Sequence, residues 1–334
     1  MKTEIIAELG QGFEGSFEQA RMLLLASASA GADAAKFQMV FADELATPEY
    51  KHYVLFKSLE MSEAAWQELA AYAQSLDIEL QVDIFGSQSL RMAEAIGVRT
   101  IKLHGTDIAN EGLLSQVKKS SINRILLGAG GAYRSEIDNA IQILSEKEIV
   151  ILLGFQGYPT PIGANQITRI RALAQAYGKN YPKVSVGFSD HALPDESLRY
   201  ALPVLALGSG AVVLEKHLTL GRSMQLEDYE SALNPDEFME FSKIVRECDQ
   251  AIGRFLNVEN FGMSESEEVY RKMIRRHVVA SRNLHKGESI SVADLVLKRT
   301  SAEHAITDLH EVYQKSLKRD VVANLPILLD DVDF

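Results

Sequence analysis

The stretch that decides the fold is residues 183–220, KVSVGFSDHALPDESLRYALPVLALGSGAVVLEKHLTL. It begins with a short apolar run, continues through a helical pattern, and ends in a second apolar run. Apolar runs with amphipathic stretches between them indicate a parallel sheet covered by helices. Ser-Asp-His (189–191) stands at the end of the first run and Glu-Lys-His (215–217) at the end of the second, so both apolar runs end in polar residues.

The same alternation extends over the sequence that precedes this stretch. Eight apolar runs with helical patterns between them occupy about 250 residues, which is the size of a TIM barrel. The expected strands are residues 4–8, 33–38, 78–83, 99–104, 123–128, 148–153, 183–189 and 210–215. Ser62 and Asp195 precede helical patterns and are the expected N-caps. We therefore predict an α/β fold, a (β/α)8 barrel over residues 1–254.

The alternation of strands and helices stops after the barrel. Residues 255–276 form a charged connector, which we expect to be a linker. Residues 277–334 contain short strand patterns broken by turn signals such as His285-Lys286-Gly287, and they predict a small, mostly β domain. A unit of this size has little surface to bury alone, so we expect it to pack on the barrel or on a partner subunit.

Composition and charge exclude several classes of protein. Of 334 residues, 46% are hydrophobic and 24% charged, and no apolar run approaches the ~18 residues of a membrane span. The formal charge is −12 and no basic cluster offsets it, so we expect no nucleic-acid partner. The single cysteine, Cys248, cannot form an intramolecular disulfide. The N-terminal MKTEIIAELG carries acids and reads as a first strand, so we expect a cytoplasmic protein.

Polar residues gather at the carboxyl ends of the expected strands, which form the functional face of such a barrel. They are Glu8, Lys36, Gln38, Asp83, Lys102, His104, Ser189, His191, Glu215 and His217. Four strands carry them as i, i+2 pairs, which the two-residue period of a strand places on one face. We predict that they point into one mouth. For any single residue, such as Lys36, a structural role in the barrel interior stays open.

His191 and His217 are the candidate metal ligands. Both end adjacent strands, and each lies beside an acid, Asp190 or Glu215. Imidazoles supported by carboxylates suit manganese, zinc or a similar divalent ion, and two protein ligands leave positions for substrate oxygen and water. Taken singly, either histidine is as readily a core or capping residue. Likewise, the glycine-rich segment 128–131 can cradle phosphate or simply turn the chain.

Together these motifs resemble the sialic acid (N-acetylneuraminate) synthase family. The segments that carry the likeness are IIAELG (5–10), AAKFQ (34–38), IKLHGTDIAN (101–110), YPTP (158–161), GFSDH (187–191), LEKHLTL (214–220) and VVASRNLHKGESISVADLVLKR (278–299). They span almost the whole chain, and the C-terminal part is similar to the family's antifreeze-like (SAF, β-clip) domain. The resemblance implies a homodimer in which each antifreeze-like domain caps the partner's barrel.

The resemblance also implies a reaction. Phosphoenolpyruvate would condense with an open-chain N-acyl amino sugar to give a nine-carbon 2-keto acid, a nonulosonic acid, and phosphate. The C3 carbon of phosphoenolpyruvate would attack the sugar aldehyde, water would add at C2, and phosphate would leave. His191 and His217 would hold a divalent ion, manganese or magnesium, that polarises the aldehyde.

The resemblance assigns the remaining roles residue by residue. Lys36 and Lys102 would bind the carboxylate and phosphate of phosphoenolpyruvate, and Glu8 would handle the proton of the attacking water or of the sugar oxygen. Gln38 and Tyr158 would orient the substrates, Glu215 and Asp228 would bind sugar hydroxyls, and Arg299 would reach across the dimer to the sugar's acyl group. Further substrate-binding positions would be Asp83, Gln156 and Ser189.

Several positions depart from the family pattern. A threonine of the family aligns with Asp83, a serine with Gly105, and a hydroxyl-bearing loop with residues 128–131. Each lost hydrogen bond to a charged group costs on the order of 1.5 to 3 kcal/mol. The Asp83 carboxylate also repels phosphate unless it is protonated or paired, for example with Lys36 or Lys102. We therefore expect that the metal half of the site is kept and that the phosphate half is rebuilt.

Three functions follow from these residues. The first is a phosphoenolpyruvate-dependent synthase with an unusual sugar acceptor, and the second is a metal-dependent aldolase or lyase that uses pyruvate. The third is a non-catalytic, sugar-binding paralogue. A charged mouth is costly to bury, and its retention argues against the third function. The sequence does not decide between the first two, and it identifies neither the sugar nor the metal.

Overall fold

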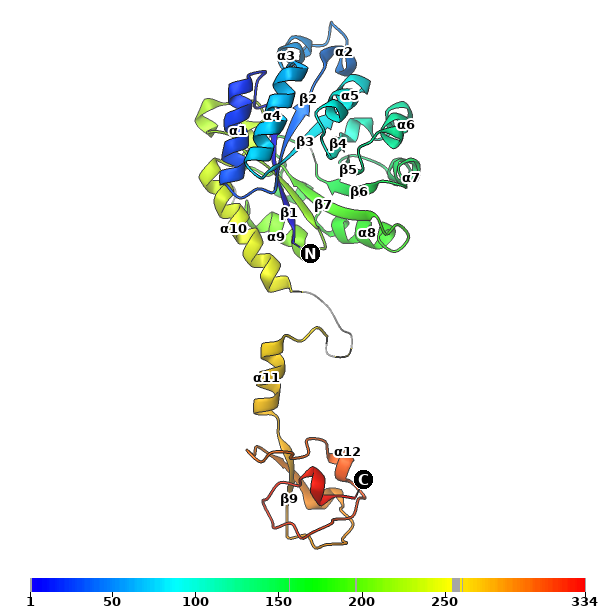
Figure 1. The fold of residues 1–334 in the computed structure, drawn as a ribbon, viewed down its shortest axis with the longest axis vertical. Helices are drawn as coiled ribbons and strands as arrows, with labels where there is room; N and C mark the ends of the chain where they lie inside the picture. Colours follow the sequence, from blue (N-terminus) through cyan, green and yellow to red (C-terminus); the bar gives the residue numbers. More distant parts are fainter. Residues whose placement is uncertain (1, 156, 196, 254–258, 260, 334) are drawn as a thin grey trace. The chain divides into compact units, whose positions relative to one another are not determined.

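The computed structural model consists of a closed strand barrel and a smaller C-terminal unit (Figure 1). It describes residues 2–155, 157–195, 197–253, 259 and 261–333. The two units are Met1–Gly253 and Arg254–Phe334. Each unit has a buried apolar core of its own.

Eight parallel strands close the barrel in sequence order, each pairing with the next and β8 with β1. They are β1 (Glu4–Gly10), β2 (Ala34–Met39), β3 (Glu79–Ile84), β4 (Thr100–Leu103), β5 (Arg124–Gly128), β6 (Glu148–Leu153), β7 (Val184–Asp190) and β8 (Val213–His217). Every expected strand overlaps one of them. The predicted (β/α)8 barrel is therefore confirmed.

Helices surround the strands (Figure 1). They are α1 (Phe17–Ser29), α2 (Ala42–Leu45), α3 (Tyr53–Ser58), α4 (Glu63–Ser75), α5 (Ser87–Ala95), α6 (Glu111–Lys119), α7 (Arg134–Ile143), α8 (Thr168–Tyr177), α9 (Ala201–Gly208) and α10 (Pro235–Ile252). The short helices α2 and α3 were not expected from the sequence. Among the described residues, no helix combines the length and apolarity that crossing a membrane requires.

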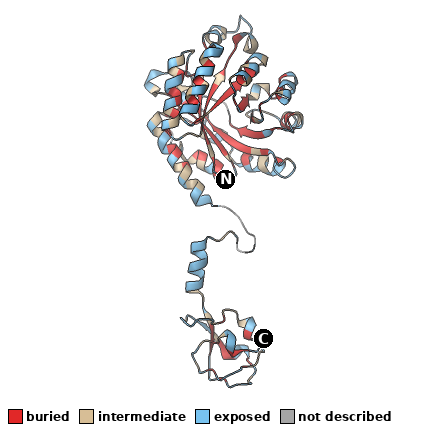
Figure 2. Ribbon diagram, viewed as in Figure 1, coloured by how far each residue is buried: buried red, intermediate tan, exposed pale blue. Residues whose placement is uncertain are grey.

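An apolar layer fills the middle of the barrel interior. Its buried members are Ile6, Ala34, Leu126, Val150, Leu152 and Val213. Because strand residues alternate between faces, the positions two residues further along these strands also face inward, at the carboxyl ends. Figure 2 shows the strands as the most buried part of this unit. This apolar layer fills the interior on the amino-terminal side of those positions. The mouth at the carboxyl ends of the strands therefore has a packed apolar floor, and polar side chains lie above it.

Two local expectations about β8 and α9 are corrected. Strand β8 begins at Val213 and not at residue 210, because Gly210 takes a positive φ of 104° and the Ala211 N–H closes α9 by bonding to Ala206 O. Asp195 does not cap α9, which begins only at Ala201. The Ser62 cap is confirmed, since its Oγ accepts a hydrogen bond from the Ala65 N–H at 3.2 Å.

The second unit contains α11 (Glu265–Ile274), β9 (His277–Ala280), β10 (Leu295–Lys298) and α12 (Leu309–Val312). The strands β9 and β10 pair antiparallel, and isolated bridges such as Leu284 with Val321 extend the pairing. Helix α11 lies in the segment expected to be an irregular linker. The apolar core of the unit consists of Val278, Ala280, Leu284, Ile290, Leu295, Ile306, Val312, Leu317, Val321, Ile327 and Val332.

Candidate active site

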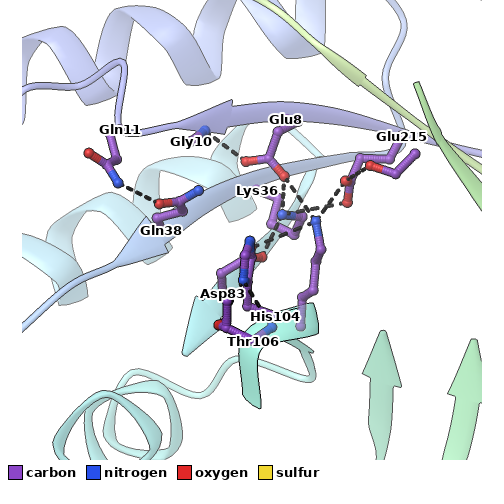
Figure 3. Close-up of polar contacts among 11 residues, drawn as sticks. Glu8, Gly10, Gln11, Lys36, Gln38, Asp83, His104, Thr106 and Glu215 are labelled. Carbon is purple, nitrogen blue, oxygen red and sulfur yellow. Dashed lines mark hydrogen bonds and ion pairs between the residues drawn. The ribbon is translucent and has the colours of Figure 1, made fainter. Parts of the chain in front are cut away.

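Five ionisable side chains meet at the mouth of the barrel, above the apolar layer. Glu8 lies on β1, Lys36 on β2, Asp83 on β3, Lys102 on β4 and Glu215 on β8. Each is at most 4% exposed. Figure 3 shows Glu8, Lys36, Asp83 and Glu215 converging from different strands. The sequence predicted this convergence from strand parity, and the closed barrel supplies it by bringing distant strands together.

The two lysines are held by three carboxylates. Lys36 Nζ donates to Glu8 Oε2 and to Asp83 Oδ1, the latter at 2.5 Å, and lies 3.5 Å from Glu215 Oε2. Lys102 Nζ donates to Glu215 Oε1 at 2.7 Å and lies 3.7 Å from Asp83 Oδ2. Asp83 is therefore paired with both lysines. With all five groups ionised, the cluster carries one excess negative charge.

Glu8 is the carboxylate of this cluster that can exchange a proton near neutral pH. Burial raises the pKa of Glu8 to about 7, with Lys36 opposing and Asp83 and Glu215 adding to the shift. Burial also acts on Glu215, but Lys102 and Lys36 outweigh it and hold the pKa of Glu215 below its ordinary value. The same carboxylates raise the pKa of both lysines although burial opposes this, so both lysines are charged.

Two histidines lie beside this cluster, at the ends of β7 and β8. The rings of His191 and His217 have centroids 5.2 Å apart, and the residues are 1% and 3% exposed. Burial lowers the pKa of His191 to about 3 and that of His217 well below its ordinary value, so both rings are neutral. His191 Nδ1 and His217 Nε2 are buried, and neither has a hydrogen-bond partner among the described residues.

Neutral imidazoles with unpartnered buried nitrogens fit a divalent metal ion. Among the described residues, no group of three or more His, Cys, Asp or Glu side chains is arranged to hold a metal. The pair therefore offers two protein ligands, and the remaining coordination positions would belong to substrate and water.

The acids beside the histidines do not support them, which corrects the sequence interpretation. Asp190 lies on the opposite face of β7 from His191, because adjacent strand residues alternate, and it pairs with Lys216 at 3.1 Å. Glu215 does face inward, but its Oε1 accepts hydrogen bonds from Lys102 Nζ and Ser189 Oγ. Ser189 therefore belongs to the buried cluster through Glu215.

Tyr158 covers the histidine pair. Its ring centroid lies 5.1 Å from that of His191 and 5.6 Å from that of His217, edge-on to both. The residue is 42% exposed and lies in the loop that follows β6. An incoming substrate that approaches the histidines would therefore meet the Tyr158 ring.

Two further predicted residues lie near the end of β1. Gln38 Oε1 accepts a hydrogen bond from Gln11 Nε2 at 2.8 Å, which links the ends of β1 and β2. The Asp228 carboxylate packs on Gly10, where an added Cβ would lie 2.4 Å from Asp228 Oδ2. Gly10 also has a positive φ of 50°, so only glycine fits there without strain. Burial raises the pKa of Asp228 to about 6.

Two predicted residues lie outside the part of the barrel that the structure describes. Arg299 lies in the second unit, directly after β10, with an exposed side chain. Gln156 lies outside the described residues.

No role was assigned to His104 from the sequence, although its i, i+2 spacing from Lys102 placed it on the inward face of the strand. His104 Nδ1 lies 2.9 Å from Thr106 Oγ1 (Figure 3). The His104 ring centroid is 5.8 Å from that of Phe85. Burial and the nearby Lys102 lower the pKa of His104. The neutral ring adds a polar group to the rim of the mouth on the side of β4.

Close backbone packing explains Gly128, the last residue of β5 and the first of the glycine-rich segment 128–131. A Cβ on Gly128 would lie 2.8 Å from Gly105 N and 3.1 Å from Leu103 O, because the ends of β4 and β5 approach each other closely. Gly131 has a positive φ of 76°. Gly128 is therefore required by the close approach of the two strand ends and Gly131 by the turn of the chain, which was one of the two sequence interpretations.

Comparisons with known proteins agree with the barrel fold. A sequence model of the NeuB family matches residues 23–257. An uncharacterised protein of Methanocaldococcus jannaschii is 29% identical over 99% of this chain and 94% of its own length. An N,N'-diacetyllegionaminic acid synthase of Legionella pneumophila is 27% identical over 98% of this chain and 94% of its own. The crystal structure of an N-acetylneuraminic acid (sialic acid) synthetase of Leptospira borgpetersenii superposes with a TM-score of 0.73 at 27% identity, covering 82% of this chain and 93% of that one.

Proposed function

Because the chain belongs to the NeuB family, we propose that it condenses phosphoenolpyruvate with the open-chain form of an N-acyl amino sugar, giving a nonulosonic acid and phosphate. The protein is an enzyme of the sialic acid synthase type. The observation that supports this reaction is the buried cluster of two lysines and three carboxylates beside two neutral histidines. Such a cluster is costly to bury, and an enzyme retains it for its chemistry.

The lysines are the anion-binding groups of the proposal. Lys36 and Lys102 are both charged, and both point into the mouth where the carboxylate and phosphate of phosphoenolpyruvate would bind. Three carboxylates already contact these lysines, so the excess negative charge of the cluster weakens the binding of an anionic donor.

Glu8 is the proton carrier of the proposal. Its Oε1 accepts a hydrogen bond from the Gly10 N–H at 2.7 Å and its Oε2 contacts Lys36, so the carboxyl group is fixed in place. A pKa of about 7 lets it take the proton of the water that adds at C2, or return one to the sugar oxygen. The new C–C bond forms between C3 of phosphoenolpyruvate and the aldehyde carbon of the sugar, and the bond between C2 and the phosphate oxygen breaks.

His191 and His217 would hold the divalent ion, manganese or magnesium. When bound, such an ion supplies Lewis-acid polarisation of the aldehyde oxygen. The chain contributes two neutral rings whose free nitrogens need no deprotonation, and the Tyr158 ring lies against both. Gln38, Asp228 and Tyr158 are the proposed contacts to the sugar.

We also propose a homodimer in which the C-terminal unit, predicted to be antifreeze-like, caps the partner's barrel and Arg299 contacts the sugar's acyl group. The exposed Arg299 side chain is free to make such a contact. Mixing Lys102→Ala subunits with Arg299→Ala subunits tests the shared site, because a hybrid dimer contains one intact site. Recovered activity in proven hybrids supports sharing, and no recovery contradicts it.

A second candidate is a pyruvate-dependent aldolase or lyase. It is favoured by Asp83, which fills the lysine pair and leaves an excess negative charge where phosphate would bind. Pyruvate carries one negative charge and would be repelled less.

One experiment separates the two reactions. Phosphate release from phosphoenolpyruvate is measured with manganese and a panel of N-acyl hexosamines, and sugar consumption is followed with the same panel and pyruvate. Phosphate release that depends on a sugar supports the synthase. Consumption of sugar with pyruvate alone, without phosphate release from phosphoenolpyruvate, overturns it in favour of the second candidate.

A further inference from the structure

A buried ion pair lies behind the histidines, on the outward face of the barrel wall. Asp190 of β7 and Lys216 of β8 are paired in register across the two strands, and their charged atoms are 3.1 Å apart. The side chains are 1% and 0% exposed. Each residue directly precedes one of the two histidines. Strand alternation turns the ion pair outward and the rings inward.

The pair holds both backbone groups of Ala192, the residue that follows His191. Asp190 Oδ1 accepts a hydrogen bond from the Ala192 N–H at 2.8 Å, and Lys216 Nζ donates to Ala192 O at 3.1 Å. The carbonyl of His191 accepts two more bonds, from the Thr160 N–H at 2.8 Å and from Ser231 Oγ at 3.0 Å. The backbone around His191 is therefore fixed from several sides although β7 ends at Asp190.

The attraction between the two charges does not by itself explain this arrangement. Replacing a buried ion pair by apolar residues of similar volume is often neutral or stabilising, because two charges lose their hydration when they are buried. Apolar side chains, however, could not hold the Ala192 amide and carbonyl. The ion pair therefore provides fixed backbone geometry at the point where β7 and β8 present their rings.

We propose that Asp190 and Lys216 are positioning residues that set the separation and orientation of the His191 and His217 rings. Through the strand backbone they hold two rings with centroids 5.2 Å apart, as shared binding of one ion requires. This inference deepens the proposed function and rests on it where metal binding is concerned. It assigns to Asp190 a role on the outward face of the barrel wall, without a direct hydrogen bond to an imidazole ring.

The decisive variant is Asp190→Leu/Lys216→Met in the full-length protein. It removes both charges together, whereas either single change leaves an unpaired buried charge. We expect the midpoint of thermal unfolding to fall, because the buried Ala192 amide and carbonyl lose these partners. We also expect the dissociation constant for manganese alone to rise by about tenfold or more, as for other residues that orient metal ligands. If this variant does not fold, Asp190→Asn/Lys216→Met is judged by the same criterion.

A matched control is Lys147→Met. Lys147 is also a buried lysine that donates to two carbonyls, Ser120 O at 2.8 Å and Ile122 O at 2.7 Å, but it lies away from the mouth. We expect this control to unfold at a lower temperature and to bind manganese as the wild type does. A double variant that binds manganese within twofold of the wild type overturns the inference.

A metal-free measurement separates this inference from the proposed function. Imidazole nitrogen signals of the ¹⁵N-labelled protein are recorded with a chelator present and assigned with His191→Gln and His217→Gln. We expect both signals to shift in the double variant and to stay unchanged in Lys147→Met. Wild-type protein that binds no manganese contradicts the proposed metal site, yet the signals still decide the positioning role. Unchanged signals in the double variant overturn it.

Discussion

The two ends of the barrel interior bury charge in different ways. At the amino-terminal end, Arg124 donates to Glu4 Oε1 at 2.9 Å and to Glu148 Oε1 at 3.2 Å, and Gln81 Nε2 also donates to Glu4. The Arg124, Glu4 and Glu148 side chains are 20%, 18% and 53% exposed, so water solvates them. At the mouth, five ionisable side chains are at most 4% exposed.

This difference separates structural polarity from functional polarity. A solvated network at the amino-terminal end closes the barrel at little cost, because each charge keeps part of its hydration. The mouth loses that hydration and also carries an excess carboxylate, which stability alone does not favour. The catalytic face of a TIM barrel lies at the carboxyl ends of its strands, and in this barrel the energetic cost of burying charge is concentrated at that end.

The largest expected effect comes from breaking the mouth cluster. Lys36→Met leaves Glu8 and Asp83 without their main partner in a dry site. We expect the free energy of unfolding to fall by about 3 to 5 kcal/mol and activity to be lost. Urea denaturation and the phosphate-release assay measure both. A stable and active variant would mean that the mouth is no more sensitive than the other end.

Removing one histidine should affect metal binding more than folding. His217→Leu takes away one of two proposed protein ligands, so we expect manganese to bind more than about 100-fold more weakly, beyond the effect of residues that only orient a ligand. Because the His217 ring is neutral and its Nε2 has no hydrogen-bond partner among the described residues, the free energy of unfolding should change less than in Lys36→Met. Titration with manganese and thermal unfolding test this. Unaltered affinity contradicts the site.

The pH dependence should report Glu8. If its carboxylate accepts the proton, kcat should fall about tenfold per pH unit below an apparent pKa of about 7. The folded protein keeps this proton at pH values where the unfolded chain has lost it, so the Glu8 contribution to the free energy of unfolding decreases as pH rises from about 4.5 to about 7. Glu8→Gln should abolish both dependences. A wild-type profile that is flat between pH 5 and 8 excludes this role.

Asp83→Thr should improve phosphoenolpyruvate binding. Removing a unit charge near an anion strengthens binding by about 1 kcal/mol or more at an effective dielectric near 20, so KM should fall roughly fivefold. Steady-state kinetics with both donors measure this change. Loss of activity with pyruvate and no gain with phosphoenolpyruvate would favour the second candidate function.

The smallest effect is expected at the opposite end of the barrel. Arg124→Met removes a partly solvated ion pair and should lower the free energy of unfolding by only about 1 kcal/mol. kcat and KM should stay at wild-type values. An activity loss comparable to that of Lys36→Met would erase the distinction between the two ends.

Strand parity predicted much of the candidate site. Glu8, Lys36, Asp83, Lys102 and Glu215 were expected in one mouth, and the structure brings them into direct contact. Strand parity also contradicted one interpretation drawn from the sequence, the support of His191 by Asp190. Residues adjacent to an inward-facing histidine must face outward, so Asp190 could not support His191.

Local sequence determined the order of strands and helices, the face on which each strand residue lies, and the polar ends of the strands. These follow from hydrophobic periodicity and side-chain alternation, which depend on neighbours in the chain. Only the tertiary structure decided that Lys36 bonds to Glu8 and Asp83, that Asp190 pairs with Lys216, and that the C-terminal unit has its own core. Barrel closure and strand register set those distances, and the pKa of Glu8 follows from the burial and charges that result.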